Sequence, residues 1–181
     1  MQPGDLDRLD DIDATVETTR YLHLDRAGEG LAVSWRLEER PLREKLIAPL
    51  PLNDERRFLV RQIARGADEG LALLAEHEGA VVAALVAQPQ PGAGVLRVVD
   101  VRVDYDFRRQ GLGTALVFRA IQHARETGLR AVAAEARTNN FPANQFLAKC
   151  GFDLAGVDAQ RDSNHDLVKE SATLIWYAAL D

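Results

Sequence analysis

The run Arg108-Arg109-Gln110-Gly111-Leu112-Gly113-Thr114 constrains the fold of this chain most strongly. It follows an apolar stretch typical of a strand, Val95–Val103, and opens an amphipathic stretch typical of a helix, which extends to about Thr127. The first turn of a helix has N–H groups without partners and a partial positive charge, and the two glycines remove side chains that would keep a bulky anion away. The run therefore predicts a diphosphate site at a strand-turn-helix, to which the two arginines add positive charge.

Two common nucleotide-binding motifs are excluded by the residues present. A dinucleotide fingerprint needs a third glycine where Leu116 stands, and the NTPase loop needs Gly-Lys-Ser/Thr, which this run lacks. What remains is the pattern Arg/Gln-x-x-Gly-x-Gly/Ala, formed by Arg108, Gly111 and Gly113. Taken alone, this hexapeptide fits an ordinary turn as well as it fits a phosphate site.

Composition predicts one globular domain over residues 1–181, because 46% of the residues are apolar and 28% are charged. Apolar runs such as Ala80–Ala87 are too short to cross a membrane, and the first residues are acidic, so we expect a cytoplasmic protein without a membrane partner. The single cysteine, Cys150, and four scattered histidines predict neither a disulfide nor a metal site. The net charge of -6 disfavours nucleic-acid binding and suits a cationic partner, although solubility explains it as well.

Hydrophobic periodicity predicts antiparallel strands first and strand-helix-strand units later. We expect a short acidic helix at Asp5–Ile12, an irregular connection bracketed by Pro41, Pro49 and Pro51, and a loop over Asp158–Glu170. The expected strands are Thr18–Leu24, Val33–Leu37, Leu71–Glu76, Ala80–Gln88, Val95–Val103, Ala131–Ala136, a strand from Phe152, and Leu174–Leu180; the expected helices are Asp54–Arg65, Gly111–Thr127 and Phe141–Lys149. This order indicates an α/β (α+β) fold with a mixed, mostly antiparallel sheet and helices on both faces.

A second motif follows the first: Asn140-Phe-Pro-Ala143-Asn-Gln-Phe146-Leu147-Ala-Lys-Cys-Gly151-Phe152. In this order and spacing the two motifs resemble those of the GNAT superfamily of N-acetyltransferases, over about Leu71 to Tyr177. The hairpin at Thr18–Leu37, the stretch Pro41–Lys45 and Gly156-Val157-Asp158 are similar to the streptothricin acetyltransferase branch. The resemblance implies acetyl-CoA as co-substrate, no metal, the primary amine of a small cationic molecule as acceptor, and a homodimer as one option.

The resemblance also implies a cofactor site. A bulge in Val95–Val103 would splay this strand from Ala131–Ala136, and the pantetheine arm would lie between the two strands. Asn140 would bond the arm, and asparagine is equally a favoured helix cap. Pantetheine would be held by the backbone of Val101, Arg102 and Val103, and pyrophosphate by the N–H groups of Gln110, Gly111, Leu112, Gly113 and Thr114.

For catalysis the resemblance implies Glu135 as the base that takes the proton of the amine, the alternative being a surface glutamate. Arg102 stands where other members carry a carboxylate, and Asp100, two residues earlier on the same side, can pair with it. Leu147 replaces the tyrosine that protonates the leaving thiolate, so Tyr105, Tyr177 or water must substitute. A second hypothesis is therefore a non-catalytic acyl-CoA-binding or sensing protein. We expect the segments 5–50 and 158–171 to choose the acceptor.

Overall fold

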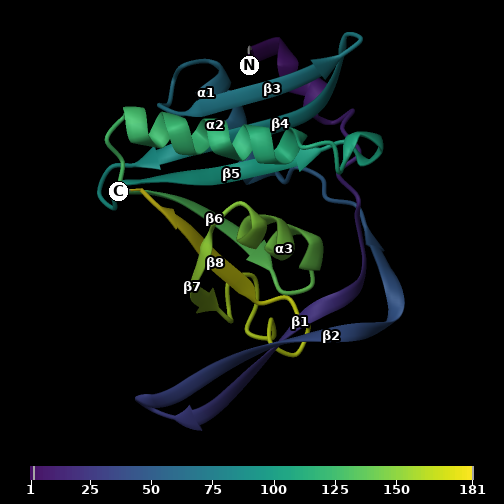
Figure 1. Cartoon of the computed structure of the whole chain (residues 1–181), viewed down its shortest axis with the longest axis vertical. Coiled ribbons are helices and arrows are strands. Elements are labelled where there is room, and N and C mark those ends of the chain that lie inside the picture. Colours follow the sequence, from purple (N-terminus) through teal and green to yellow (C-terminus); the bar gives the residue numbers. More distant parts are fainter. Residues whose placement is uncertain (2, 181) are drawn as a thin grey trace. The chain divides into compact units, whose positions relative to one another are not determined.

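The computed structural model describes Met1 and residues 3–180 and has a mixed α/β fold (Figure 1). One sheet pairs β1 with β2, and the other has the strand order β3-β4-β5-β6-β8-β7. Pairing is antiparallel from β3 to β5 and parallel between β5 and β6, which confirms the predicted mixed sheet. The strands are β1 Val16–Glu29, β2 Ala32–Ala48, β3 Leu71–His77, β4 Ala80–Gln90, β5 Val95–Val103, β6 Ala131–Arg137, β7 Asp153–Asp158 and β8 Thr173–Ala179; the α-helices are α1 Asp54–Ala64, α2 Leu112–Glu126 and α3 Phe141–Lys149.

The chain divides into two compact units. Unit 1 consists of Met1–Thr15, Pro49–Ala134 and Tyr177–Asp181, and unit 2 of Val16–Ala48 and Glu135–Trp176. Unit 1 thus holds β3, β4, β5, α1 and α2, whereas unit 2 holds the β1–β2 hairpin, α3 and β7. The expectation of one domain over residues 1–181 stays a prediction.

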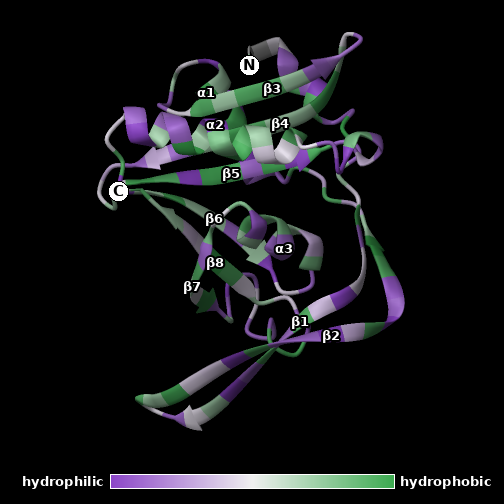
Figure 2. Cartoon of the chain, viewed as in Figure 1, coloured by the Kyte–Doolittle hydropathy of each residue, from purple (hydrophilic) through white to green (hydrophobic). Residues whose placement is uncertain are grey.

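Unit 1 has a helix on each face of its strands. Figure 1 shows α2 crossing in front of β4 and β5, with α1 on the far side of β3. Helix α1 begins where predicted, because Oδ1 of Asn53 accepts from the Arg56 N–H at 2.8 Å and so caps its first turn. Apolar residues concentrate on β3, β4 and β5 (Figure 2). The buried core on the α1 face consists of Leu6, Leu9, Ile12, Leu52, Val60, Ile63, Val81, Ala84 and Val86.

A bulge interrupts β5 in its middle. Val86 pairs with Asp100 but Ala87 pairs with Val98, so Val99 is one residue in excess. The parallel ladder between β5 and β6 joins only Val95–Arg97 to residues 131–133 among the described residues. The second half of β5 therefore has no ladder on its β6 side, as the splayed strand pair predicts.

The N-terminal segment is expected from the sequence to form one short acidic helix over Asp5–Ile12. It is helical only in part, as two 3-10 helices, η1 Pro3–Asp5 and η2 Asp7–Leu9, so the predicted extent is wrong. Its hydrogen bonds span three residues, as from Leu9 N–H to Leu6 O at 3.2 Å. Leu6, Leu9 and Ile12 are all buried, and their spacing of three puts them on one side of a 3-10 helix. Burial of these three side chains thus selects the tighter helix.

In unit 2 the prediction of an irregular connection from Pro41 onward is wrong, because β2 continues through Pro41 to Ala48. A strand in a two-stranded sheet has one open edge, where a residue without an N–H costs no ladder bond. The register shifts between Thr18 and Arg20, next to the partner of Pro41. There the Thr18 hydroxyl accepts from Arg20 N–H at 3.0 Å and donates to Arg20 O at 2.7 Å, which replaces the interrupted ladder.

Buried Thr138 joins three segments of unit 2. Its carbonyl accepts from the Leu22 N–H of β1 at 2.9 Å, and its own N–H donates to Ala172 O at 2.8 Å. Its hydroxyl donates to Glu170 O at 2.8 Å. These bonds hold the hairpin and the segment before β8 against the turn that leads into α3.

Candidate functional site

The turn before α2 presents a group of backbone donors. Gly111 is the N-cap at a φ of 85°, and Arg109 also has a positive φ, 62°. The first helical bond runs from Ala115 N–H to Gly111 O at 2.9 Å, and within the described chain the N–H groups of residues 110–114 have no bonding partner. A Cβ added at Gly111 would meet nothing within 4 Å, so the space beside this glycine is open. Such a set of N–H groups at the positive end of a helix suits an anion.

The two arginines of the turn differ in what they bind. Arg108 donates from Nε to Val103 O at 3.1 Å, from Nη1 to Thr15 O at 2.7 Å and from Nη2 to Asp13 O at 3.2 Å. Arg109 is exposed, and its guanidinium has no partner among the described residues. Arg108 therefore anchors the N-terminal segment to β5, whereas Arg109 is available to a ligand. That either arginine binds phosphate stays a prediction.

The backbone of Val101, Arg102 and Val103 lies in the half of β5 beyond the bulge. Val101 and Val103 pair with Leu85 and Ala83 of β4 on one side. On the other side the described strands offer no ladder, so this backbone edge can receive an extended ligand as an additional strand.

Arg102 and Asp100 form a buried ion pair on the α1 face of β5. Arg102 donates from Nε to Oδ2 of Asp100 at 2.7 Å and from Nη2 to Oδ1 at 3.0 Å, and the two side chains are 3% and 5% exposed. Arg56 of α1 places Nη1 3.9 Å from Oδ1 of Asp100. The expectation that Asp100 pairs with Arg102 is thus confirmed.

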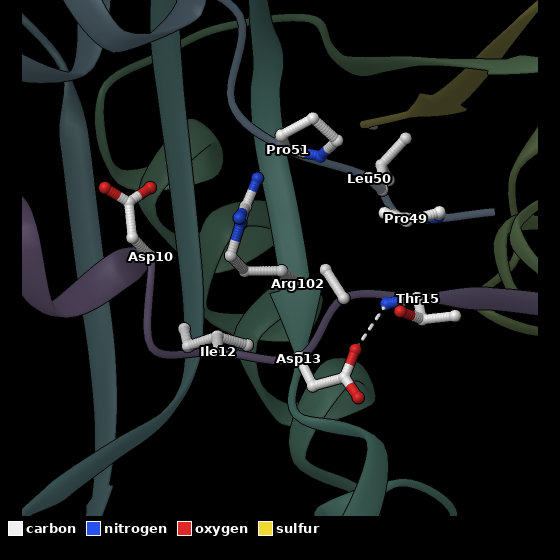
Figure 3. Close-up of a pocket in the computed structure, with 9 residues that line it drawn as sticks. Asp10, Ile12, Asp13, Thr15, Pro49, Leu50, Pro51 and Arg102 are labelled. Carbon is white, nitrogen blue, oxygen red and sulfur yellow. Dashed lines mark hydrogen bonds between the residues drawn. The ribbon is translucent and has the colours of Figure 1, made fainter.

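A cavity of about 380 Å³ opens at Arg102 within unit 1. Its walls come from two separated segments, residues 10–15 and residues 49–51 (Figure 3). Figure 3 shows the Arg102 side chain directed toward Pro51, with Asp13 bonded to Thr15 on another side of the cavity. Neither segment belongs to a motif. Their only sequence signal was that residues 10–15, Pro49 and Leu50 lie inside the segment 5–50 expected to choose the acceptor, whereas Pro51 lies just outside it.

Two acidic residues of this cavity are ionised. Both oxygens of Asp10 accept from Arg57, at 2.8 and 2.7 Å, and this bond lowers the pKa of Asp10. Oδ1 of Asp13 accepts from Thr15 N–H at 2.9 Å, and the bonds from Thr15 lower the pKa of Asp13. The carboxylate of Asp10 is therefore neutralised by an ion-pair partner, while that of Asp13 is bonded by the neutral residue Thr15, with the charge of Arg108 acting on it more weakly.

In unit 2 Asn140 is the N-cap of α3. Its Oδ1 accepts from Ala143 N–H at 3.2 Å, which confirms the cap, and its amide nitrogen has no partner among the described residues. Asn144 behind it is fully bonded, since Nδ2 donates to Arg137 O at 2.8 Å and Oδ1 accepts from Trp176 Nε1 at 2.9 Å. The cap is therefore held rigidly, and binding of pantetheine by Asn140 stays a prediction.

Glu135 lies on β6 in unit 2 and forms an ion pair with Arg161 from the loop after β7. Arg161 also approaches Asp158, with 3.8 Å between Nη1 and Oδ2. The bond with Glu135 raises the pKa of Arg161, which keeps this cation charged. Sequence reasoning missed Arg161, because nothing in the spacing of residues 135 and 161 indicates contact.

A buried leucine, Leu147, occupies the position where the resemblance implies a tyrosine. Leu147 is 4% exposed on α3, and Cys150, the C-cap of this helix, is buried too. Of the two tyrosines in unit 1 suggested as substitutes, Tyr105 is exposed beneath the Arg108 guanidinium, 5.1 Å from the ring centroid. Tyr177 packs against a small apolar cluster and under Arg130. The geometry does not choose between them and water as the proton donor.

Among the described residues no three His, Cys, Asp or Glu side chains are grouped as metal ligands. In the described part of the chain, no helix has both the length and the apolar character needed to cross a membrane.

Comparison with known proteins identifies the family. The model of the acetyltransferase (GNAT) family matches residues 33–152. Streptothricin acetyltransferase A of Bacillus subtilis (strain 168) is 34% identical over 84 residues, 46% of this chain and 48% of that protein. Streptothricin acetyltransferase of Escherichia coli is 32% identical over 75 residues, 41% and 43% of the two chains. The matched region thus spans about half the length of these relatives.

Solved structures show the same fold over the whole chain. The crystal structure of nourseothricin acetyltransferase has a TM-score of 0.81 and 22% identity, and the alignment covers 100% of this chain and 96% of that one. A putative streptothricin acetyltransferase from Bacillus anthracis str. Ames, in complex with acetyl coenzyme A, has a TM-score of 0.74 and 20% identity, with 100% and 95% covered. This chain therefore belongs to the acetyltransferase (GNAT) family and within it resembles the streptothricin acetyltransferases.

Proposed function

We propose that the chain transfers the acetyl group of acetyl-CoA to a primary amine of a small cationic acceptor. The observation that carries the proposal is the set of unpartnered N–H groups at residues 110–114 of the described chain, at the start of α2, where the space beside Gly111 is open. Backbone donors of this kind fit a diphosphate, and the open edge of β5 beyond Arg97 fits an extended arm with amide groups. The donor set therefore matches both chemical parts of a CoA thioester.

Acetyl-CoA would supply an activated acyl group, and the chain would position and deprotonate the amine. The ammonium loses a proton to a base, the nitrogen forms a bond to the acyl carbon, and the carbon–sulfur bond breaks. The nitrogen then loses its second excess proton, and the thiolate takes up a proton and leaves as the thiol. Glu135 is the proposed base. Because it is ion-paired with Arg161, a cationic acceptor that displaces this arginine would meet the carboxylate directly.

A cationic acceptor is supported by the charge of the chain and by its relatives. The net charge of -6 attracts cations over the whole surface. The curated relatives are named for streptothricin, so a streptothricin-type amine is the acceptor we propose to test first. A cytoplasmic location and a single functional domain over residues 1–181 belong to the same proposal, with a homodimer as one option.

Calorimetric titration with acetyl-CoA tests the cofactor half of the proposal. We expect saturable binding that Gly111→Glu abolishes, because the new carboxylate would stand where the diphosphate binds. Gly128→Glu is the matched control, since Gly128 follows the other end of α2, has a φ of 71° and also has open space at its Cβ. Absence of binding by the parent, or equal loss in both variants, would contradict the site.

A non-catalytic acyl-CoA-binding protein is the second candidate. It is favoured by buried Leu147 in place of a proton donor and by the ion pair that engages Glu135. Both candidates predict cofactor binding, and they differ in turnover. Release of free thiol that depends on an added amine excludes the second candidate, while binding without any such release excludes the first.

A further inference from the structure

The guanidinium of Arg102 has one nitrogen directed to the cavity. Its bonds to Asp100 use Nε and Nη2 and leave Nη1 without a partner among the described residues. No fully buried side-chain nitrogen or oxygen in that part of the chain lacks a partner, so Nη1 must be reachable from the cavity that Arg102 lines. A side chain that is otherwise almost fully buried thus offers N–H donors to a ligand in this cavity.

The charges around the cavity are of both signs. Arg102 lines the cavity, and together with Asp100 and Arg56, which lie outside the lining, it carries one net positive charge. Asp13 supplies a negative charge on the wall, and its carboxylate is bonded by the neutral residue Thr15. Asp10 adds little, because Arg57 neutralises it. The cavity therefore suits a molecule that has a hydrogen-bond acceptor at one end and a cation at the other.

The cavity also adjoins the strand that would hold the pantetheine arm. The side chain of Arg102 enters the cavity, while the backbone of the same residue belongs to the open edge of β5. Arg108 bonds the wall at Asp13 and Thr15 to Val103, the residue that follows Arg102 on β5. A ligand in the cavity would therefore lie beside the proposed path of the acyl group, because the hydrogen bonds of Arg108 connect the cavity wall to β5.

We infer that this cavity binds the acceptor, and that the acceptor is an amine carrying a carboxylate or amide carbonyl whose oxygen accepts from Nη1 of Arg102 while its ammonium group faces Asp13. The inference rests on the proposed function, since it names the substrate class of the same site. It makes Arg102, which replaces the carboxylate usual at this position, a residue that selects the acceptor. A plain diamine has no group for Arg102 and binds less tightly.

L-Lysine, L-lysinamide and cadaverine form a matched set of probes, because they share the amine chain and differ in a carboxylate, an amide or neither. Calorimetry with and without CoA measures their binding to the whole chain. We expect lysine or lysinamide to bind at least about tenfold more tightly than cadaverine, as a charged hydrogen bond provides. Tighter binding of lysine than of lysinamide identifies a carboxylate as the group that accepts from Arg102. Equal binding of the two identifies a carbonyl oxygen as sufficient.

Arg102→Gln should reduce this preference to less than about threefold, while the surface change Arg125→Gln should preserve it. If Arg102→Gln does not fold, the same measurement is made on Arg102→Lys, which keeps a cation next to Asp100. Asp13→Asn should weaken all three probes alike, because each carries an ammonium group. Equal binding of cadaverine, an unchanged preference without Arg102, or no binding of any probe overturns the inference.

Failure of the proposed function gives a different result. If no amine causes thiol release but the preference dependent on Arg102 persists, acetyl transfer is refuted and the cavity remains a binding site. If thiol release occurs without that preference, acetyl transfer stands and the role of Arg102 is refuted.

Discussion

Arg108 and Arg109 are adjacent arginines of the same motif, but the structure predicts that only the replacement of Arg108 lowers the stability of the chain. Arg108→Gln removes three bonds to carbonyl oxygens, at 3.1, 2.7 and 3.2 Å. The bond to Asp13 O is exposed and contributes little, whereas the two partly buried bonds from a charged donor contribute about 1 to 2 kcal/mol each. We therefore expect Arg108→Gln to lower the free energy of unfolding by about 2 to 4 kcal/mol.

Arg109→Gln keeps the same backbone strain and breaks no bond of the described chain, so its unfolding free energy should change by less than about 0.5 kcal/mol. In a chain of this size the Arg108 variant should melt roughly 5 to 15 °C below the parent. Urea unfolding followed by circular dichroism measures both variants. Equal destabilisation, or a stable Arg108 variant, would refute the view that Arg108 anchors the N-terminal segment.

Three further predictions concern unit 2. Burial lowers the pKa of His23, but its bonds to Glu170 at 2.8 Å and Asp25 at 3.0 Å outweigh burial and raise that pKa overall. This stabilisation is complete below about pH 6.5 and is lost as the pH rises through the folded-state pKa of His23. The urea midpoint of the parent should therefore fall as the pH rises above about 6.5, and that of His23→Gln should fall less. Equal falls in the two proteins would contradict the pairing of His23 with the two carboxylates. Leu147→Tyr should raise kcat in the thiol-release assay by up to about 100-fold while costing about 1 to 3 kcal/mol of stability, and no gain would mean that the site does not follow the family geometry. Asn140→Ala should lose about 1 kcal/mol and raise the KM for acetyl-CoA, whereas Asn140→Asp keeps the cap and raises only the KM; an unchanged KM in both would leave Asn140 as a cap alone.

The half of the fold that contains the motifs could be predicted from sequence because local chemistry determines it. An apolar run before two glycines defines β5 and the start of α2, and Asn53 caps α1 as its residue type predicts. The first fifty residues could not be predicted as well. Pro41 indicates a break by itself, and only the open edge of a two-stranded sheet explains why β2 continues through it.

The candidate site divides in the same way. The backbone donors at residues 110–114 follow from helix geometry, so the sequence alone locates them. The cavity could not be predicted, because Asp13 and Pro51 are distant in sequence and meet only through long-range contacts such as that of Arg108 with Thr15 O. The partner of Glu135 was equally hidden, since Arg161 lies in a loop without a motif.

Acceptor-dependent release of thiol from acetyl-CoA tests the central claim most directly. With the parent chain, the account predicts thiol release that rises with the concentration of an amine bearing a carboxyl or amide oxygen and that is absent in Gly111→Glu but retained in Gly128→Glu. Release at the same rate without an amine, or the same amine-dependent rate in Gly111→Glu, would contradict it.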